Sequence, residues 1–158
     1  MHPAYQASYN VAALSFDLYR AVLDDLPPEA LHWKPEGAGN TIQVLVTHSI
    51  GASRFWLQVG CGIERSLKDY RAGEREEAFV DKAKTTAELK ADIDTYLASL
   101  KKEADAGTDE TLTRETFFAD VADQVRVTGY EAILRGLAHL REHVGEAQLT
   151  RDLWKARK

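Results

Sequence analysis

The feature that most constrains the fold is a repeated spacing of apolar side chains, three and four residues apart, in four stretches of the chain. A helix that buries one stripe of its surface needs this spacing. The predicted helices cover residues 4–26, 41–59, 86–104 and 129–154. With no convincing strands between them, they predict an all-α fold, a four-helix bundle in which one or more connections cross over.

Local signals set the ends of these helices. Pro27-Pro28 ends the first one, because proline cannot continue the backbone hydrogen bonds. Each later helix begins with a predicted capping box, in which the first side chain caps the helix and the residue three positions on reaches back. The three pairs are Asn40 with Gln43, Thr85 with Glu88, and Thr128 with Glu131.

Large apolar residues are expected to face the core. In the first helix the aromatic stripe of Tyr5, Tyr9, Phe16 and Tyr19 is more typical of a core than of an interface. In the last helix the residues expected toward the core are Tyr130, Ile133, Leu134, Leu137, Leu140 and Val144.

The connections carry weaker patterns. Residues 64–84 are charged and poor in large apolar groups, which predicts an exposed linker. Within 106–128 only Val125-Arg126-Val127 indicates a short extended piece. We expect residues 1–158 to form a single domain, since this length buries a sizeable core.

Composition excludes some classes of protein. The net charge of −5 argues against nucleic-acid binding, which needs clustered Lys and Arg. There is no apolar run long enough for a membrane span and no pattern of a signal peptide at the N-terminus. Cys61 is the only cysteine, which excludes an internal disulfide. We therefore expect a cytoplasmic protein with no nucleic-acid or membrane partner.

His139 and His143 stand four residues apart in the last predicted helix. Such residues lie on one face, so both imidazoles can reach one metal ion. The alternative is two histidines on a polar helix face. Ala132 and Gly136 lie on the same face, and their small size either admits a neighbouring helix or leaves room for a ligand.

His48 lies at the edge of the apolar stripe of the second helix. It is either a hydrogen-bonded core residue or a third ligand, because bundle metal sites are built from side chains on facing helices. Glu146, three residues after His143, can orient a ligand, act as a base, or simply be a surface carboxylate. The sequence His-x-x-Glu-His also fits an inverted zincin motif, but Glu142 points away from His143 and too few residues follow to supply a further ligand.

With these residues identified, the chain resembles the DinB superfamily over nearly its whole length. The segments that carry the resemblance are Leu31–Gly37, Gly39–Ile42, Val46–His48, Gly51–Trp56 and His139–Gly145. Family members bind a divalent metal through one histidine of the second helix and two, spaced H-x-x-x-H, of the fourth. His48, His139 and His143 match these positions. One residue departs from the pattern, since many relatives have Gln where this chain has Glu146.

The resemblance implies a four-helix bundle of up-down-down-up connectivity, frequent homodimers and a small-molecule substrate. Characterised relatives include S-transferases and isomerases that use bacillithiol, mycothiol or glutathione, and metal-dependent hydrolases. Three imidazoles suit Zn, our first choice, or Ni or Fe, and leave coordination positions open for water or a thiol. The rival interpretation is a non-catalytic stress-response or binding protein with a structural or vestigial metal site.

Overall fold

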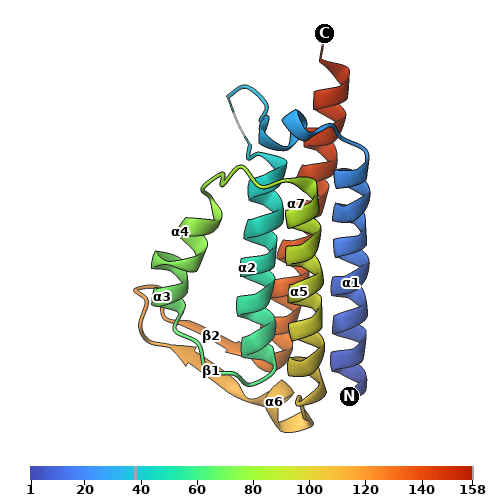
Figure 1. Ribbon diagram of the computed structural model, residues 1–158. Helices are drawn as coiled ribbons and strands as arrows, with labels where there is room; N and C mark the ends of the chain where they lie inside the picture. Colours follow the sequence, from blue (N-terminus) through green and yellow to red (C-terminus); the bar gives the residue numbers. More distant parts are fainter. Residues whose placement is uncertain (38, 158) are drawn as a thin grey trace.

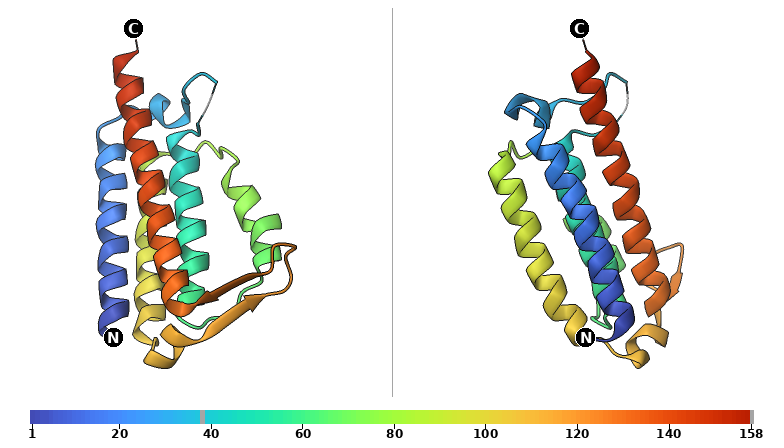
Figure 2. Two further views of the ribbon diagram at one scale, coloured as in Figure 1. Left: turned by 180° about the vertical axis from the view of Figure 1, so that it is seen from behind. Right: turned by 90° about the vertical axis from the view of Figure 1, so that its right-hand side faces the viewer.

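The computed structural model describes residues 1–37 and 39–157, most of which are helical. Four long helices lie side by side: α1 (Pro3–Asp24), α2 (Ile42–Gly60), α5 (Thr86–Asp105) and α7 (Gly129–Ala156) (Figure 1). The chain runs in one direction along α1 and α7 and in the opposite direction along α2 and α5. The two chain ends consequently lie at opposite ends of the molecule (Figure 2).

Shorter elements connect the long helices. They are η1 (Pro28–His32), α3 (Leu67–Ala72), α4 (Glu74–Ala78), α6 (Asp109–Thr113), β1 (Glu115–Phe118) and β2 (Val125–Thr128). The strands pair in an antiparallel hairpin, with Glu115 opposite Thr128 and Phe118 opposite Val125. The extended piece predicted at 125–127 is confirmed. The all-α prediction holds for the bulk of the described chain, which adds to its helices this small two-stranded sheet. Phe118 and Val127 of the sheet pack into a second apolar cluster.

The main core lies between the four long helices. Phe16 of α1 and Tyr96 of α5 meet edge to face, with ring centroids 5.5 Å apart. The hydroxyl of Tyr19 lies 2.6 Å from that of Ser49 and connects α1 to α2. Tyr5, Phe16 and Tyr19 are fully buried, as expected for core residues, and Tyr9 is partly buried against the same core.

Residues 64–84 are not the exposed linker that their charge predicted. They form α3 and α4, and Leu67 and Tyr70 are buried. The ring of Tyr70 stacks on Phe55 of α2 with centroids 4.3 Å apart. Two apolar residues three positions apart are enough to bury one face of a six-residue helix, a signal too short to stand out in the sequence.

Two of the three predicted capping boxes are confirmed, at Thr85 with Glu88 and at Thr128 with Glu131. The third is wrong by one residue. Thr41 caps α2, and its hydroxyl accepts a hydrogen bond from the backbone N–H of Val44. Gln43 does not reach back to the cap, because its side-chain oxygen accepts from the backbone N–H of Lys82.

The buried face of α7 agrees with the prediction at Ile133, Leu140 and Val144 and differs from it at two other positions. Tyr130 and Leu134 are 47% and 65% exposed, whereas the small residues Ala132 and Gly136 are buried. A Cβ atom at Gly136 would lie 3.0 Å from the Cβ of Trp56. The small residues therefore admit the neighbouring helix α2, and this close approach turns the larger side chains outward.

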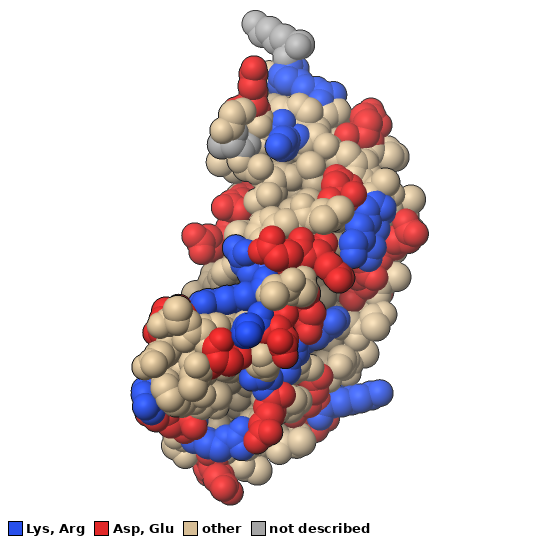
Figure 3. All heavy atoms as spheres, turned by 90° about the vertical axis from the view of Figure 1, so that its left-hand side faces the viewer, with Lys and Arg blue, Asp and Glu red and all other residues tan. Residues whose placement is uncertain are grey.

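Acidic and basic residues are interspersed on the face that carries α3 and α4, without a patch of one sign (Figure 3). In the described part of the chain, none of the helices has both the length and the apolar character needed to cross a membrane.

Candidate metal centre

Three histidines from two helices meet at one point between α2 and α7. The Nε2 atom of His139 lies 3.4 Å from Nε2 of His48 and 3.2 Å from Nε2 of His143. One nitrogen from each ring can be chosen so that all three lie within 4.8 Å of one another. Residues 91 positions apart in the chain are thus brought into a single cluster.

Close packing of α2 against α7 makes this convergence possible. These two helices share the most extensive contact of any pair of elements. Gly136 lies against Trp56, and a Cβ at Gly60, the last residue of α2, would be only 2.5 Å from Ile133. Because glycines let the backbones approach, imidazoles on both helices can reach one another.

The donor set fits a divalent ion. Ligand nitrogens about 2.0–2.1 Å from a tetrahedral ion lie about 3.3–3.4 Å apart. The two nitrogen separations around His139, 3.2 and 3.4 Å, are close to that spacing. Nitrogen atoms at this spacing are therefore compatible with one shared divalent cation.

The surroundings keep the rings of His48 and His139 in the neutral form that a metal ligand needs. Burial, followed by the neighbouring His139, His143 and Arg75, lowers the pKa of His48 from 6.5 to about 3. Burial and His143 also lower the pKa of His139. At neutral pH both rings therefore carry a free nitrogen lone pair.

Glu146 lies where its spacing predicted. Its carboxylate accepts a hydrogen bond from Nδ1 of His143 at 2.7 Å, which leaves Nε2 of that ring directed at the other two histidines. A carboxylate in this position fixes the tautomer and orientation of a ligating histidine. By contrast, Nδ1 of His48 and of His139 are buried and have no hydrogen-bond partner among the described residues.

Two residues that sequence reasoning missed complete the surroundings. The ring of Phe79 packs on His48, with centroids 4.4 Å apart, and the guanidinium of Arg75 lies 5.0 Å from the Phe79 centroid. The hydroxyl of Thr47 donates to the backbone carbonyl of Ala78 at 3.1 Å and holds this segment against α2. Phe79 is one of the few large apolar residues in 64–84, and that rarity was the available signal.

Comparison with known families agrees with this geometry. The model of the DinB superfamily matches residues 13–147, a range that contains the three histidines and Glu146. The chain belongs to the DinB superfamily. A solved structure of an uncharacterised protein from Clostridium difficile 630 has the same fold, with a TM-score of 0.67 and 14% identity over 98% of this chain and 97% of that one. Comparison with curated protein sequences found no match.

Other candidate residues of this DinB protein lie outside the cluster. Cys61 is buried at the end of α2, and burial together with Glu103 raises the pKa of its thiol to about 12. It therefore remains a protonated thiol at neutral pH. Glu142 is exposed, as expected for a surface residue.

Proposed function

We propose that this DinB protein is a divalent-metal-dependent enzyme whose ion is bound by His48, His139 and His143. The observation that carries the proposal is the convergence of the three rings, with nitrogen atoms within 4.8 Å of one another. Three neutral ligands leave the charge of the ion uncompensated and coordination positions open, as in catalytic sites.

Zn is the first choice of metal, with Ni or Fe as alternatives, because imidazole suits all three. Such an ion supplies Lewis-acid activation of water or of a thiol at neutral pH. Transfer to a thiol of low molecular weight and hydrolysis are both compatible with the site, and membership of the DinB superfamily favours thiol-dependent S-transfer.

The residues around the site have separable roles in this proposal. Glu146 holds the imidazole of His143 in the tautomer that presents Nε2. Phe79 covers the ring of His48, which is only 4% exposed, and excludes water from that side. The side chain of His143 remains 14% exposed, so a small molecule can approach the cluster from this direction. Arg75 places a positive charge near His48 and His139 and forms an ion pair with Glu76.

The proposal extends to the assembly and to the location of the protein. The directions of the long helices in Figure 1 support the DinB-type four-helix bundle with up-down-down-up connectivity. A homodimer in the cytoplasm, acting on a small molecule, is the form we propose, on the family resemblance and on the single cysteine.

The test is metal analysis of protein purified without a nickel column. We expect close to one equivalent of metal in the wild type and almost none in His48→Ala or His139→Ala. His32→Ala is the matched control, since His32 pairs with Asp81 outside the cluster and its loss should leave the metal content unchanged. Equal and negligible metal in all four proteins would overturn the proposal.

A second experiment separates the enzyme from a non-catalytic metal protein. The metal-loaded wild type is assayed with bacillithiol, mycothiol or glutathione and the electrophile monochlorobimane, and with 4-nitrophenyl acetate for hydrolysis. Turnover that His139→Ala abolishes and His32→Ala retains supports the enzyme. Metal binding without turnover in any assay favours the rival interpretation of a binding or stress-response protein.

A further inference from the structure

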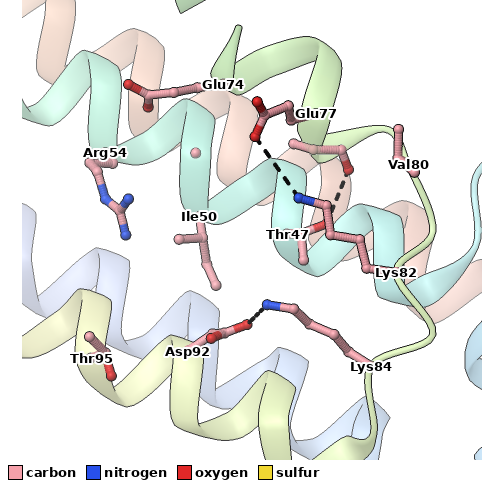
Figure 4. Close-up of a pocket in the computed structure, with 12 residues that line it drawn as sticks. Thr47, Ile50, Arg54, Glu74, Glu77, Val80, Lys82, Lys84, Asp92 and Thr95 are labelled. Atoms are coloured by element: carbon pink, nitrogen blue, oxygen red, sulfur yellow. Dashed lines mark hydrogen bonds and ion pairs between the residues drawn. The ribbon is translucent and has the colours of Figure 1, made fainter.

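A cavity lies on another side of α2 from the histidine cluster, facing α5. It has a volume of about 330 Å³ and is bounded by α2, by α4 with the segment that follows it, and by α5 (Figure 4). This volume is at the lower end of the range for small-molecule sites. A small ligand with part of its surface in solvent would fit there.

The cavity is separate from the histidine cluster. Ala78 and Val80 line it, whereas Phe79 between them packs on the ring of His48. None of the three histidines is among its lining residues. The segment 78–80 therefore forms a wall with the cavity on one side and the metal centre on the other.

Charges in the cavity are paired, with one exception. Lys84 forms an ion pair with Asp92, and Lys82 lies 4.0 Å from Glu77, as the dashed lines in Figure 4 show. Glu74 pairs with Arg65. Arg54 takes part in no ion pair or side-chain hydrogen bond within residues 1–37 and 39–157, so its charge is the one left without a carboxylate.

The environment of Arg54 suits an anionic ligand. Its side chain is half-buried and extends from α2 toward α5, near Thr95 (Figure 4). The guanidinium lies 5.6 Å from the centroid of the Tyr96 ring, a contact that restrains its orientation. A planar guanidinium held in this way presents two parallel N–H donors, the arrangement that binds a carboxylate through both oxygens.

Part of the remaining wall is apolar and leaves free space. Ile50, Ala78 and Val80 contribute aliphatic surface. Gly51 also lines the cavity, and a Cβ atom added to it would meet nothing within 4 Å. Among the described residues, the cavity thus has one cationic group without an ion pair and an adjoining apolar surface.

From these features we propose that the cavity binds a small amphiphilic monocarboxylate. Its carboxylate pairs with Arg54, and its short hydrocarbon part lies against Ile50 and Val80. The unpaired charge of Arg54 matches the single negative charge of a monocarboxylate. A doubly charged phosphate ester is less favoured, because its second charge would face the carboxylates of Glu77 and Asp92. The proposal is independent of metal binding by the histidines.

The test is a titration with hexanoate, followed by the backbone amide signals in NMR spectra. We expect saturable shifts centred on Ile50, Gly51 and Val80, and no such shifts with the neutral hexanamide. Arg54→Gln should weaken hexanoate binding at least about tenfold, since a charged hydrogen-bonded pair is lost. Hexyl phosphate is the second probe and should bind more weakly than hexanoate.

Two further variants control the experiment. Gly51→Leu places a side chain in the cavity and should abolish binding while Arg54 stays in place, and thermal melting checks that the variant is folded. Arg71→Gln removes an exposed arginine of α3 that pairs with Asp123 outside the cavity, and it should bind hexanoate as the wild type does. Absence of saturable shifts in the wild type, unchanged affinity in Arg54→Gln, or tighter binding of hexyl phosphate would overturn the proposal.

Discussion

Helix α2 packs closely against α7 on one side and borders a cavity on the side that faces α5. On the side that faces α7, glycines bring two backbones together, and three imidazoles from distant parts of the chain meet. On the side that faces α5, the Cβ position of Gly51 is open, ion pairs line the walls, and a cavity of about 330 Å³ remains. His48 and Thr47 are neighbours in sequence, yet one belongs to the histidine cluster and the other lines the cavity.

The difference shows how a glycine acts in two ways within one helix. At Gly60 the missing side chain is replaced by Ile133 of α7, so the glycine improves packing. At Gly51 nothing replaces it, so the helix carries the conformational cost of glycine and gains open space. Alanine substitutions at Gly60 and at Gly51 therefore distinguish a close-packed contact from an open space.

The largest effect on stability is expected for Gly60→Ala. The added Cβ would lie 2.5 Å from Cγ1 of Ile133 and 3.1 Å from the backbone oxygen of Gly129, so the helices must move apart. We expect the free energy of unfolding to fall by about 1–3 kcal/mol, as for other overpacked cores. Urea unfolding measures this change. A Gly60→Ala protein as stable as the wild type would show that the contact between α2 and α7 is loose.

The next largest effect concerns the support of the metal centre. Glu146→Ala removes the acceptor that holds Nδ1 of His143, and we expect metal affinity to fall about 10–100-fold. Glu146→Gln should have a smaller effect, because its amide oxygen still accepts this hydrogen bond. Competition with a chelator measures the affinity. Glu142→Ala is the matched control, and an equal loss there would mean that general surface charge, not the hydrogen bond, matters.

Acid should destabilise the metal-free protein through His48, which lies on the side of α2 that faces α7. The pKa of the His48 imidazole is about 3 in the folded protein and has its ordinary value of 6.5 in the unfolded chain. Between these two pH values, the imidazole is therefore protonated only in the unfolded chain. Stability is therefore retained above about pH 6.5 and lost as the pH falls, by up to about 1.4 kcal/mol per pH unit for this group. Urea unfolding at pH 5.0, 6.0 and 7.0 with EDTA measures the slope. In His48→Gln the slope should be shallower, and identical slopes would contradict the prediction.

The smallest effect is expected on the cavity side, with the opposite sign. Gly51→Ala adds a methyl group where nothing lies within 4 Å and removes a glycine from the interior of α2. We expect the protein to become more stable by up to about 1 kcal/mol, the difference in helix propensity. Thermal melting checks this, with Gly145→Ala, also open, as a parallel case. A loss of stability at Gly51 would show that the cavity tolerates no added group.

Local sequence signals were sufficient for the long helices and for two of the three predicted capping boxes. Thr85 and Thr128 cap as predicted because a capping box involves only residues within one turn. At the start of α2 two capping residues were adjacent, and the long-range bond from Lys82 to Gln43 removed the support for Asn40. Tyr130 and Leu134 failed as core predictions because the contact with α2 favours small residues over large ones.

The sequence by itself determined that His139 and His143 share a face, since a helix places residues four apart on one side. It also determined membership of the DinB superfamily, through motifs that run along most of the chain. Only the tertiary structure brought His48 to the pair, placed Phe79 over its ring and left Arg54 without an ion pair among the described residues. These relations depend on how closely α2 approaches α7 and α5, and that approach is set by packing between segments far apart in the chain.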